Sequence, residues 1–404
     1  MKKSRRAGRS RVNASLFLCV ANLGILTACT GSPSPKTNAG AGTGGDTSTA
    51  SGGAANAGGS SSGGATVGTT CPAPLDLGVR FVGRVDGCDP SGVRMAWSGT
   101  GFVGKFKGTG LTIELKDSSN QYTVLIDGQA TPTLKTIKGQ QTYTLASGLT
   151  DSEHTIEFYR RTEASQGTSL VLNIEALVGD AGIGEMLTPP AAATHKLEVI
   201  GDSITCGYGD EGIFPCAFSP DTENNYLAYG SILARALGAE LSTVAWSGKG
   251  VYSNYGGNRV EPLPALYDLT IPTDYKHPWS FAWQPDLVVI NLGTNDYSAS
   301  TDPTDTQFET AYQTLLEHIR SKYAEAFILC TIGPLLSGTD LDAVRRNIQA
   351  AIAARSSAGD THLEYYELKT PNGTPNGCDY HPSLATQAAM AAELEAEIHT
   401  QLGW

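Results

Sequence analysis

Apolar and polar positions follow two different periods along this chain. Before about residue 184, apolar residues alternate with polar ones in short runs separated by Gly and Asp turns, which is typical of half-buried β-strands. Asp127-Gly128 follows one of these runs and is a hairpin signal. We predict an all-β, jelly-roll-like sandwich over residues 75–184. Its clearest runs are Val79–Val85, Leu111–Leu115, Tyr122–Ile126, His154–Tyr159 and Leu170–Ile174.

Beyond residue 194 the pattern changes. Almost unbroken apolar runs, as expected for parallel strands covered on both faces, alternate with segments of helical period. This alternation predicts a three-layer α/β domain with a parallel sheet over residues 194–404, which makes the fold a two-domain one. The predicted strands are 197–200, 241–245, 286–292, 326–332 and 362–368, and the predicted helices are 225–237, 308–323, 341–354 and 383–402.

The amino-terminal segment has neither pattern. Its basic head is followed by an apolar stretch from Leu16 to Leu26, which is short for a membrane span and fits a secretory signal. Leu26-Thr27-Ala28-Cys29 resembles a bacterial lipoprotein cleavage box. We expect residues 1–28 to be a signal peptide, Cys29 to carry lipid, and the Gly/Ser-rich residues 29–74 to form a flexible linker. An ordinary signal peptide with a chance cysteine is the alternative.

Charge and cysteine content narrow the partners. The formal net charge of -12 disfavours nucleic acid and anionic membrane, so we expect membrane contact only through the lipid on Cys29. The expected location is the cell surface or outer membrane, or otherwise the medium. Apart from Cys19 in the predicted signal peptide and the predicted lipid site Cys29, six cysteines remain. We expect them to form disulfides in an oxidising compartment, and their spacing does not match a zinc site. Their order suggests the pairs Cys71–Cys88, Cys206–Cys216 and Cys330–Cys378, with Cys206–Cys378 as the alternative link.

Polar motifs follow the predicted strands of the second domain. In chain order they are Gly201-Asp202-Ser203, Ser247-Gly248, Asn295-Asp296 and His381-Pro382. Each alone is compatible with a turn or a helix cap. All four together, at strand or helix edges, indicate a site at the carboxyl edge of the sheet. The segment Gly99–Gly104 matches the glycine pattern of a dinucleotide-binding fingerprint. It does not indicate such a site, because strand patterns surround it and no helix follows.

These four blocks, in this order, resemble the SGNH hydrolase superfamily, named for Ser, Gly, Asn and His. Longer stretches are similar to carbohydrate esterase family 2, and the resemblance covers the chain from about Val79 to the end. Those stretches are 201–209, 247–250, 291–296, 377–383 and, in the β-domain, 159–164. That resemblance implies a small β-sandwich in front of an SGNH domain, and an enzyme that removes acetyl groups from plant cell-wall polysaccharides.

The resemblance also implies roles for residues of this chain. Ser203 is the expected nucleophile and His381 its base, because a serine hydroxyl needs an adjacent base at neutral pH. The expected oxyanion donors are the backbone N–H groups of Ser203 and Gly248 and the side-chain amide of Asn295. Cys378 occupies the superfamily's usual acid position, so either Asp379 or a backbone carbonyl orients His381.

Two tyrosines flank the motifs. Tyr297 and Tyr380 are expected either to stack on sugar rings or to serve as packing aromatics. No metal or organic cofactor is implied. We expect a Ser–His esterase acting on acetylated xylan or glucomannan. The alternatives are an esterase for a lipid, thioester or envelope acetyl group, and a non-catalytic glycan-binding lipoprotein.

Overall fold

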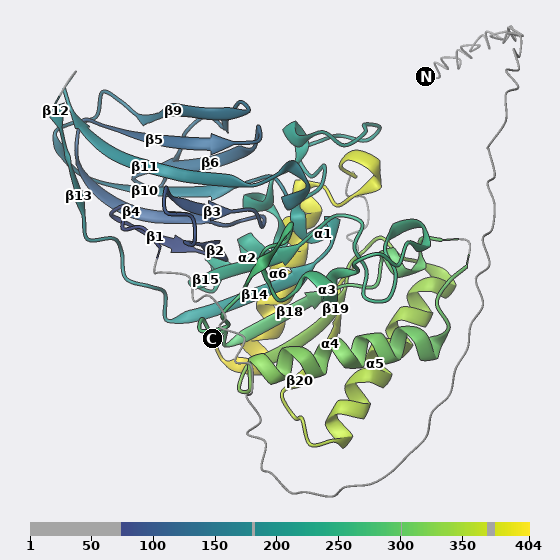
Figure 1. Ribbon diagram of the computed structural model, residues 1–404. Coiled ribbons are helices and arrows are strands. Elements are labelled where there is room, and N and C mark those ends of the chain that lie inside the picture. Colours follow the sequence, from purple (N-terminus) through teal and green to yellow (C-terminus); the bar gives the residue numbers. More distant parts are fainter. Residues whose placement is uncertain (1–73, 180–181, 300, 370–375) are drawn as a thin grey trace, which may run out of the picture. The chain divides into compact units, whose positions relative to one another are not determined.

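The computed structural model describes residues 74–179, 182–299, 301–369 and 376–404 (Figure 1). The predicted signal peptide, Cys29, Cys71 and the predicted linker up to residue 73 lie outside the described residues. Their expected roles, and the Cys71–Cys88 pair, therefore stay predictions. Within the described part of the chain, no helix combines the length and apolar character needed to cross a membrane.

The first domain is built from two antiparallel sheets, as the alternating pattern predicted. The strands of one sheet are, in spatial order, β1 (Val79–Val82), β4 (Gly101–Gly108), β10 (Ser152–Arg160), β6 (Gln121–Ile126) and β7 (Gln129–Ala130), with β13 (Glu185–Leu187) on β4 and β8 (Leu134–Lys135) on β6. Those of the other are β2 (Val85–Asp86), β3 (Val93–Met95), β11 (Ser169–Val178), β5 (Gly110–Asp117) and β9 (Gly139–Ala146), with β12 (Gly182–Ile183) on β11.

The core of this domain lies between the two sheets, where alternate residues of each strand meet. Phe102, Phe158 and Tyr122 stack there and are fully buried. The predicted hairpin is present: Asp127 and Gly128 both have positive φ and join β6 to β7. One predicted run, Val79–Val85, is split into β1 and β2, which belong to different sheets.

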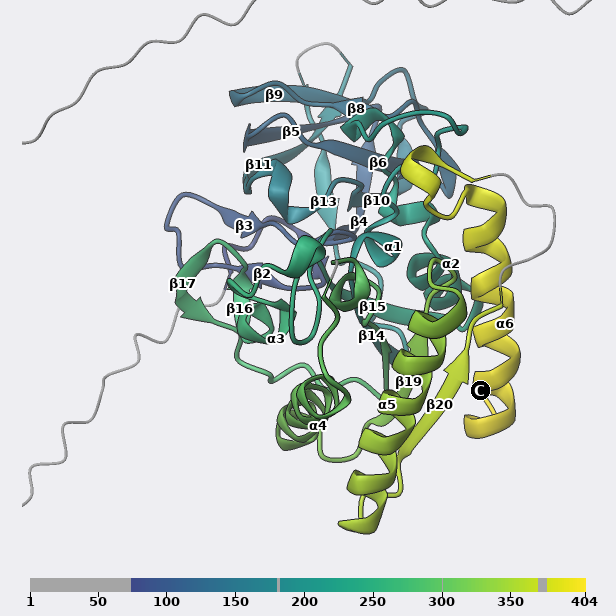
Figure 2. The same ribbon diagram turned by 90° about the vertical axis from the view of Figure 1, so that its right-hand side faces the viewer.

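The second domain has a five-stranded, fully parallel sheet between two layers of helices (Figures 1 and 2). Its strands are, in spatial order, β15 (Ala239–Ala245), β14 (His195–Gly201), β18 (Leu287–Asn291), β19 (Phe327–Ile332) and β20 (Leu363–Glu367). Its helices are α1 (Ser203–Cys206), α2 (Tyr229–Ala236), α3 (Leu263–Leu266), α4 (Asp305–Lys322), α5 (Gly338–Ser357) and α6 (Leu384–Leu402), and β16 (Leu269–Ile271) pairs with β17 (Asp274–Pro278).

Alternate side chains of each buried strand enter different cores. Leu197 and Val199 of β14 pack with the helices α2 and α6 on one face of the sheet. Ile200 and the β18 residues Val288 and Ile290 pack with α4 and α5 on the other face. Because both faces are covered, the strands read as unbroken apolar runs in the sequence.

The strand order places a crevice beside β14. The chain crosses from β14 to β15 on one side and then to β18 on the other, so the connections leave β14 in opposite directions. Ligands bind outside the carboxyl ends of the strands at such a switch point. Gly201 ends β14 in register with Ala245 of β15 and Asn291 of β18. The loops that follow these three residues carry three of the four predicted motifs, and the fourth, with His381, lies between β20 and α6.

A buried arginine ties the two domains together. Arg84, in the turn after β1, has no exposed surface, and its Nη2 lies 3.1 Å from Oε2 of Glu198 in β14. The same carboxylate accepts hydrogen bonds from Ser242, Tyr267 and Tyr323. A buried ion pair requires such additional donors to offset desolvation. The β-sandwich is thus fastened to β14, the strand that leads to Ser203.

Candidate active site

The turn after β14 presents Ser203 at the start of α1. Asp202 caps this short helix, because its side chain accepts the N–H of Ile204 at 3.0 Å and its carbonyl accepts from Thr205 and Cys206. Burial raises the pKa of Asp202 to about 7. Asp202 is therefore a structural residue of the turn in this arrangement.

His381 reaches Ser203 from 178 positions further along the chain. Its Nε2 lies 2.8 Å from the hydroxyl oxygen of Ser203. Its Nδ1 lies 3.2 Å from the backbone carbonyl oxygen of Asp379. A carbonyl only accepts, so Nδ1 carries the hydrogen and Nε2 is left free to accept the serine proton. Burial lowers the pKa of His381, which keeps the ring neutral near pH 7, as a general base requires.

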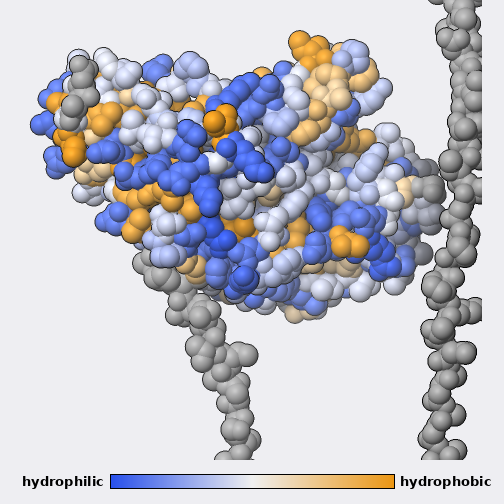
Figure 3. All heavy atoms as spheres, turned by 45° about the horizontal axis from the view of Figure 1, so that its top comes forward, coloured by the Kyte–Doolittle hydropathy of each residue, from blue (hydrophilic) through white to orange (hydrophobic). Residues whose placement is uncertain are grey.

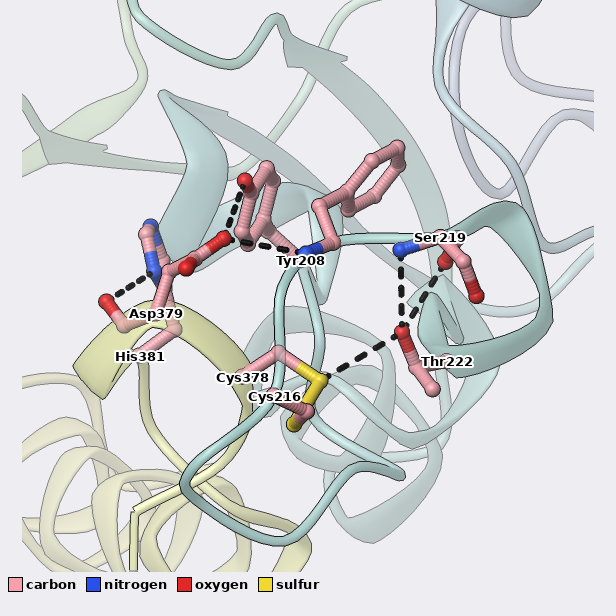
Figure 4. Close-up of a disulfide and its surroundings, with 8 residues drawn as sticks. Tyr208, Cys216, Ser219, Thr222, Cys378, Asp379 and His381 are labelled. Carbon is pink, nitrogen blue, oxygen red and sulfur yellow. Dashed lines mark hydrogen bonds between the residues drawn. A yellow bond between two sulfur atoms is a disulfide. The ribbon is translucent and has the colours of Figure 1, made fainter. Parts of the chain in front are cut away.

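The carboxylate of Asp379 points away from the histidine. Its Oδ2 accepts the Tyr208 hydroxyl at 2.9 Å and the Phe218 N–H at 3.0 Å (Figure 4). Of the two alternatives for orienting His381, the backbone carbonyl is therefore the one that contacts the ring. That carbonyl belongs to Asp379, so the residue is involved through its main chain while its side chain anchors the loop.

The loop before His381 is held in an unfavourable backbone conformation. Asp379 and Tyr380 have φ values of 49° and 65°, a region that costs a non-glycine residue roughly 1–2 kcal/mol. A disulfide between Cys216 and Cys378 fastens this loop to the segment after the nucleophile (Figure 4). Beside it, the N–H of Asp379 donates to the carbonyl of Cys216 at 2.9 Å. These ties maintain the turn that presents His381.

Two predicted disulfides, Cys206–Cys216 and Cys330–Cys378, are wrong, and so is the alternative link Cys206–Cys378. Cys206 and Cys330 are free and buried. Cys206 ends α1 with its sulfur 3.6 Å from the carboxylate of Glu163, a residue of the β-domain. Cys330 lies within β19 and packs into the core under α4 and α5. The pair Cys206–Cys216 was predicted only because the two residues are close in sequence. The pair with Cys330 was predicted on the assumption that its side chain reaches the edge of the sheet.

Gly248 lies in the loop after β15, beside Ser203. Its φ is 78°, which favours glycine, and its carbonyl accepts the N–H of Tyr255 at 2.8 Å. Among the described residues, the backbone N–H groups of Gly248 and Ser203 donate to no protein acceptor. Both are therefore free to donate to an oxyanion, as the predicted roles require.

Asp296 holds the rest of this loop. Its two carboxylate oxygens accept the N–H groups of Val251, Tyr252 and Ser253 at 3.0, 2.7 and 2.9 Å. Burial raises the pKa of Asp296 to about 6, while these three bonds favour the ionised form. The sequence block Asn295-Asp296 thus supplies one residue to the cavity and one to the support beneath the Gly248 loop.

Asn295 is oriented by two protein acceptors. Its Nδ2 donates to Asp202 Oδ2 at 3.1 Å and to the carbonyl oxygen of Lys249 at 3.0 Å. The amide is nearly buried but borders the cavity. One of its hydrogens is committed to Asp202, and an oxyanion would share or replace Lys249 as acceptor of the other. The geometry is compatible with the predicted donor role.

The catalytic groups open into a cavity of about 710 Å³. Tyr380 borders it and is 61% exposed, so it is available to stack on a sugar ring. Of the two alternatives for Tyr297, the structure supports packing and not sugar stacking: this side chain is 6% exposed, packs edge-on against Phe308 and accepts a hydrogen bond from Asn347. The other described lining residues are Ser203, Tyr208, Ser247, Gly248, Tyr255, Thr294, Asn295, Ser298, Leu335, Asp379 and His381.

Two lining tyrosines were not predicted. Tyr208 lies 4.2 Å from the His381 ring, measured between ring centroids, and Tyr255 is 70% exposed. Tyr208 lies within residues 201–209, the stretch that contains Ser203, so its place in the sequence could have indicated that it lines the site. Tyr255 had no comparable signal, because its place depends on how the loop after Gly248 returns.

Two groups of described side chains have metal-ligand spacing, and neither contains Ser203 or His381. In each, three ligand atoms lie within 4.8 Å of one another. In the first group, Asp86 already pairs with Arg94 and His277. In the second, Glu163 Oε2 accepts the N–H of Ser247, and Glu223 Oε2 accepts the N–H of Glu163. The groups are Asp86, Cys88 and His277, and Glu163, Cys206 and Glu223.

Comparison with known families assigns both domains. Residues 81–190 match the family model described as carbohydrate esterase 2 N-terminal, and residues 199–389 match the GDSL-like lipase/acylhydrolase family. The cellulase/esterase CelE of Acetivibrio thermocellus is 38% identical over 331 residues, which are 81% of this chain and 40% of that protein. An acetylxylan esterase / glucomannan deacetylase of Cellvibrio japonicus is 26% identical over 342 residues, covering 82% and 91% of the two chains.

Solved structures agree with these matches. A family two carbohydrate esterase from Clostridium thermocellum in complex with cellohexaose is 37% identical, with a TM-score of 0.77 over 81% of this chain and 99% of that one. A family two carbohydrate esterase from Cellvibrio japonicus is 26% identical, with a TM-score of 0.73 over 81% of this chain and 96% of that one. The likeness therefore spans both domains.

Proposed function

Since the chain belongs to carbohydrate esterase family 2, we propose that it removes O-acetyl groups from plant cell-wall polysaccharides such as xylan and glucomannan. The observation that carries the proposal is the 2.8 Å contact between Ser203 and His381, beside the free N–H of Gly248. The cavity that holds them opens to solvent, which suits a substrate presented on a long polymer. On the face drawn in Figure 3, hydrophobic residues are scattered among hydrophilic ones. Relatives named for these polysaccharides support the choice of substrate.

The geometry supports a two-step mechanism. The Ser203 oxygen attacks the acetyl carbonyl while His381 Nε2 takes the hydroxyl proton. The oxyanion receives hydrogen bonds from the N–H groups of Ser203 and Gly248 and from the Asn295 amide. Collapse expels the sugar oxygen, which takes the proton from His381 and leaves acetyl-Ser203. Water then attacks this ester, again giving its proton to His381, and acetate and free Ser203 result.

The lining of the cavity favours a short acyl group on a sugar. Leu335 is the one aliphatic side chain among its described lining residues, so a long acyl chain would bury little apolar surface. Aromatic rings stand near the rim instead. Tyr380 packs on Phe214, with ring centroids 4.2 Å apart, and both are exposed. Tyrosine offers an apolar face with a polar tip, which suits a sugar ring.

The test compares substrates and active-site variants. NMR analysis of products from acetylated xylan and acetylated glucomannan should show release of acetate, with 4-nitrophenyl acetate cleaved faster than a long-chain 4-nitrophenyl ester. Ser203→Ala and His381→Ala should each lower kcat by at least about 10³-fold, because they act as one unit. Near-normal turnover in either variant, or preference for the long-chain ester, contradicts the proposal.

We also propose that the protein is exported and held at the membrane by lipid on Cys29. The support is the cleavage-box sequence ending at Cys29 and the Gly/Ser-rich segment that follows it. Cys29→Ser should release the protein from the membrane fraction, and mass spectrometry of the wild-type protein should find an acylated cysteine. Membrane fractionation of Cys29→Ser without any acyl group on the wild type would contradict the anchor.

A further inference from the structure

The end of β10 brings the β-domain against the active-site loops. Arg160 is fully buried, and its guanidinium donates to the carbonyl of Glu163 at 3.0 Å. The carbonyl of Arg161 accepts the N–H of Asn225, and the N–H of Glu163 donates to the Glu223 carboxylate at 3.1 Å. Asn225 and Glu223 belong to the hydrolase domain. The backbone of Glu163 is therefore fixed relative to that domain.

The side chain of Glu163 contacts the residue before Gly248 and the last residue of the nucleophile helix α1. It is 4% exposed, and its Oε2 accepts the backbone N–H of Ser247 at 2.7 Å. The same oxygen lies 3.6 Å from the sulfur of Cys206, at the end of the helix that begins with Ser203. The other carboxylate oxygen accepts the hydroxyl of Ser165 at 2.9 Å. One carboxylate from the β-domain thus joins the nucleophile helix to the Gly248 loop.

The bond to Ser247 bears on the direction of the Gly248 N–H. That N–H belongs to the planar peptide between Ser247 and Gly248, so its direction follows from the conformation of these two residues. On one side of this peptide, Glu163 accepts the N–H of Ser247. On the other side, the carbonyl of Gly248 accepts the N–H of Tyr255. Gly248 lacks a Cβ and therefore has more conformational freedom than other residues, so the two external hydrogen bonds matter more for holding its φ near 78°.

We propose that Glu163 is a positioning residue for the oxyanion hole: it aims the Gly248 N–H by holding the backbone of Ser247. The inference rests on the proposed esterase function, because it concerns the same site. It makes the β-sandwich part of the catalytic unit. The proposal requires only that an oxygen accept the N–H of Ser247. A neutral side chain with an oxygen in the same place should therefore hold the loop equally well.

The central experiment compares Glu163→Ala with Glu163→Gln. Glutamine keeps an acceptor oxygen within reach of Ser247, whereas alanine removes it. For cleavage of 4-nitrophenyl acetate, we expect kcat of Glu163→Ala to fall about 10- to 10²-fold with KM within about twofold, since loss of an oxyanion donor costs about 10²–10³-fold. Glu163→Gln should stay within about threefold. Glu157→Ala is the matched control: Glu157 lies on β10, half-buried, and accepts from Tyr159.

A transition-state analogue separates positioning from general stability. A boronic acid that forms a tetrahedral adduct with Ser203 should bind Glu163→Ala weaker by the same factor as the loss in kcat. Thermal unfolding should show that this variant is folded at the assay temperature. A kcat within twofold of wild type, a loss in Glu163→Gln as deep as in Glu163→Ala, or unchanged inhibitor affinity would each overturn the proposal. Ser203→Ala provides the reference: if it stays active, the esterase assignment itself fails, and if it is inactive while Glu163→Ala is normal, only the role of Glu163 fails.

Discussion

Replacing Asp379 by asparagine tests how His381 is oriented. The variant keeps the backbone carbonyl that lies 3.2 Å from Nδ1 of the ring. Asparagine also tolerates the positive φ of 49° at this position. Both side-chain contacts of Asp379 converge on one oxygen, Oδ2, which accepts from Tyr208 and Phe218. An amide oxygen in the same place can accept both, so the loop should keep its shape.

The expected loss is therefore small. If the carboxylate oriented the ring, the substitution would cost about 10⁴-fold by favouring the wrong tautomer. What is lost here is only the attraction between an exposed carboxylate and the imidazolium that forms during catalysis. Exposed charge pairs of this kind are worth about 0.2–1 kcal/mol, which corresponds to roughly a 1.5- to 5-fold change in rate. We expect kcat/KM of Asp379→Asn to fall by no more than about fivefold.

The pH profile gives a second measurement with a definite sign. The negative charge of Asp379 raises the pKa of His381, against the larger effect of burial, which lowers it. Without that charge the pKa falls further, so the ring stays neutral to lower pH and the acid limb of kcat/KM should move to lower pH.

Three comparisons complete the experiment. Asp379→Ala loses the acceptor and strains the turn, so it should be worse than Asp379→Asn. Glu364→Gln removes one exposed charge on β20 and should change neither rate nor profile. A loss in Asp379→Asn as deep as that of His381→Ala would refute the reasoning, because the carboxylate would then have to orient the ring in the working enzyme.

Three other substitutions test the supports of the site. Cys216→Ser removes a crosslink between positions 162 apart and should lower the free energy of unfolding in urea by roughly 2–5 kcal/mol; an unchanged unfolding midpoint would contradict this. Arg84→Met leaves Glu198 buried without its cation and should cost about 3–5 kcal/mol in the same assay, whereas a neutral result would mean that the two domains do not depend on this pair. Gly250→Ala places a Cβ 2.0 Å from the carbonyl oxygen of Ser253, so the loop must shift and kcat should fall at least about tenfold; wild-type kinetics would show that the loop adapts freely.

Local pattern predicted the elements well where burial is regular. The strand of β18 lies within a predicted apolar run because both of its faces are covered, and α6 begins at Leu384, just after its cap Ser383. In the β-domain, β4 and β9 were missed. Gly101–Gly108 contains three glycines and two lysines, and β9 exposes most of its polar residues, so neither shows a clean alternation. Strands held mainly by their neighbours leave a weak signal in their own sequence.

The site was predictable in its motifs but not in its supports. Ser203 and His381 were located because each stands at the end of a recognisable block. The two alternatives for Tyr297 could not be separated from the sequence, because the short 3₁₀ segment 295–297 turns its ring into the core, beside Phe308, and no periodicity predicts such a turn. The role of the Asp379 main chain and the Cys216–Cys378 link depend on how two distant loops meet, which spacing along the chain does not record.

The distance between nucleophile and base along the chain has a consequence for synthesis. Ser203 and His381 are 178 positions apart, and four of the five sheet strands are made after the nucleophile turn and before the histidine. A ribosome therefore completes the β-sandwich and the nucleophile long before it adds the base. A nascent or prematurely terminated polypeptide carries Ser203 without a partner and is inert as an esterase. Hydrolytic activity is therefore possible only after translation has passed the loop that carries His381. In a series of carboxyl-terminal truncations assayed on 4-nitrophenyl acetate, no chain that ends before His381 should be active.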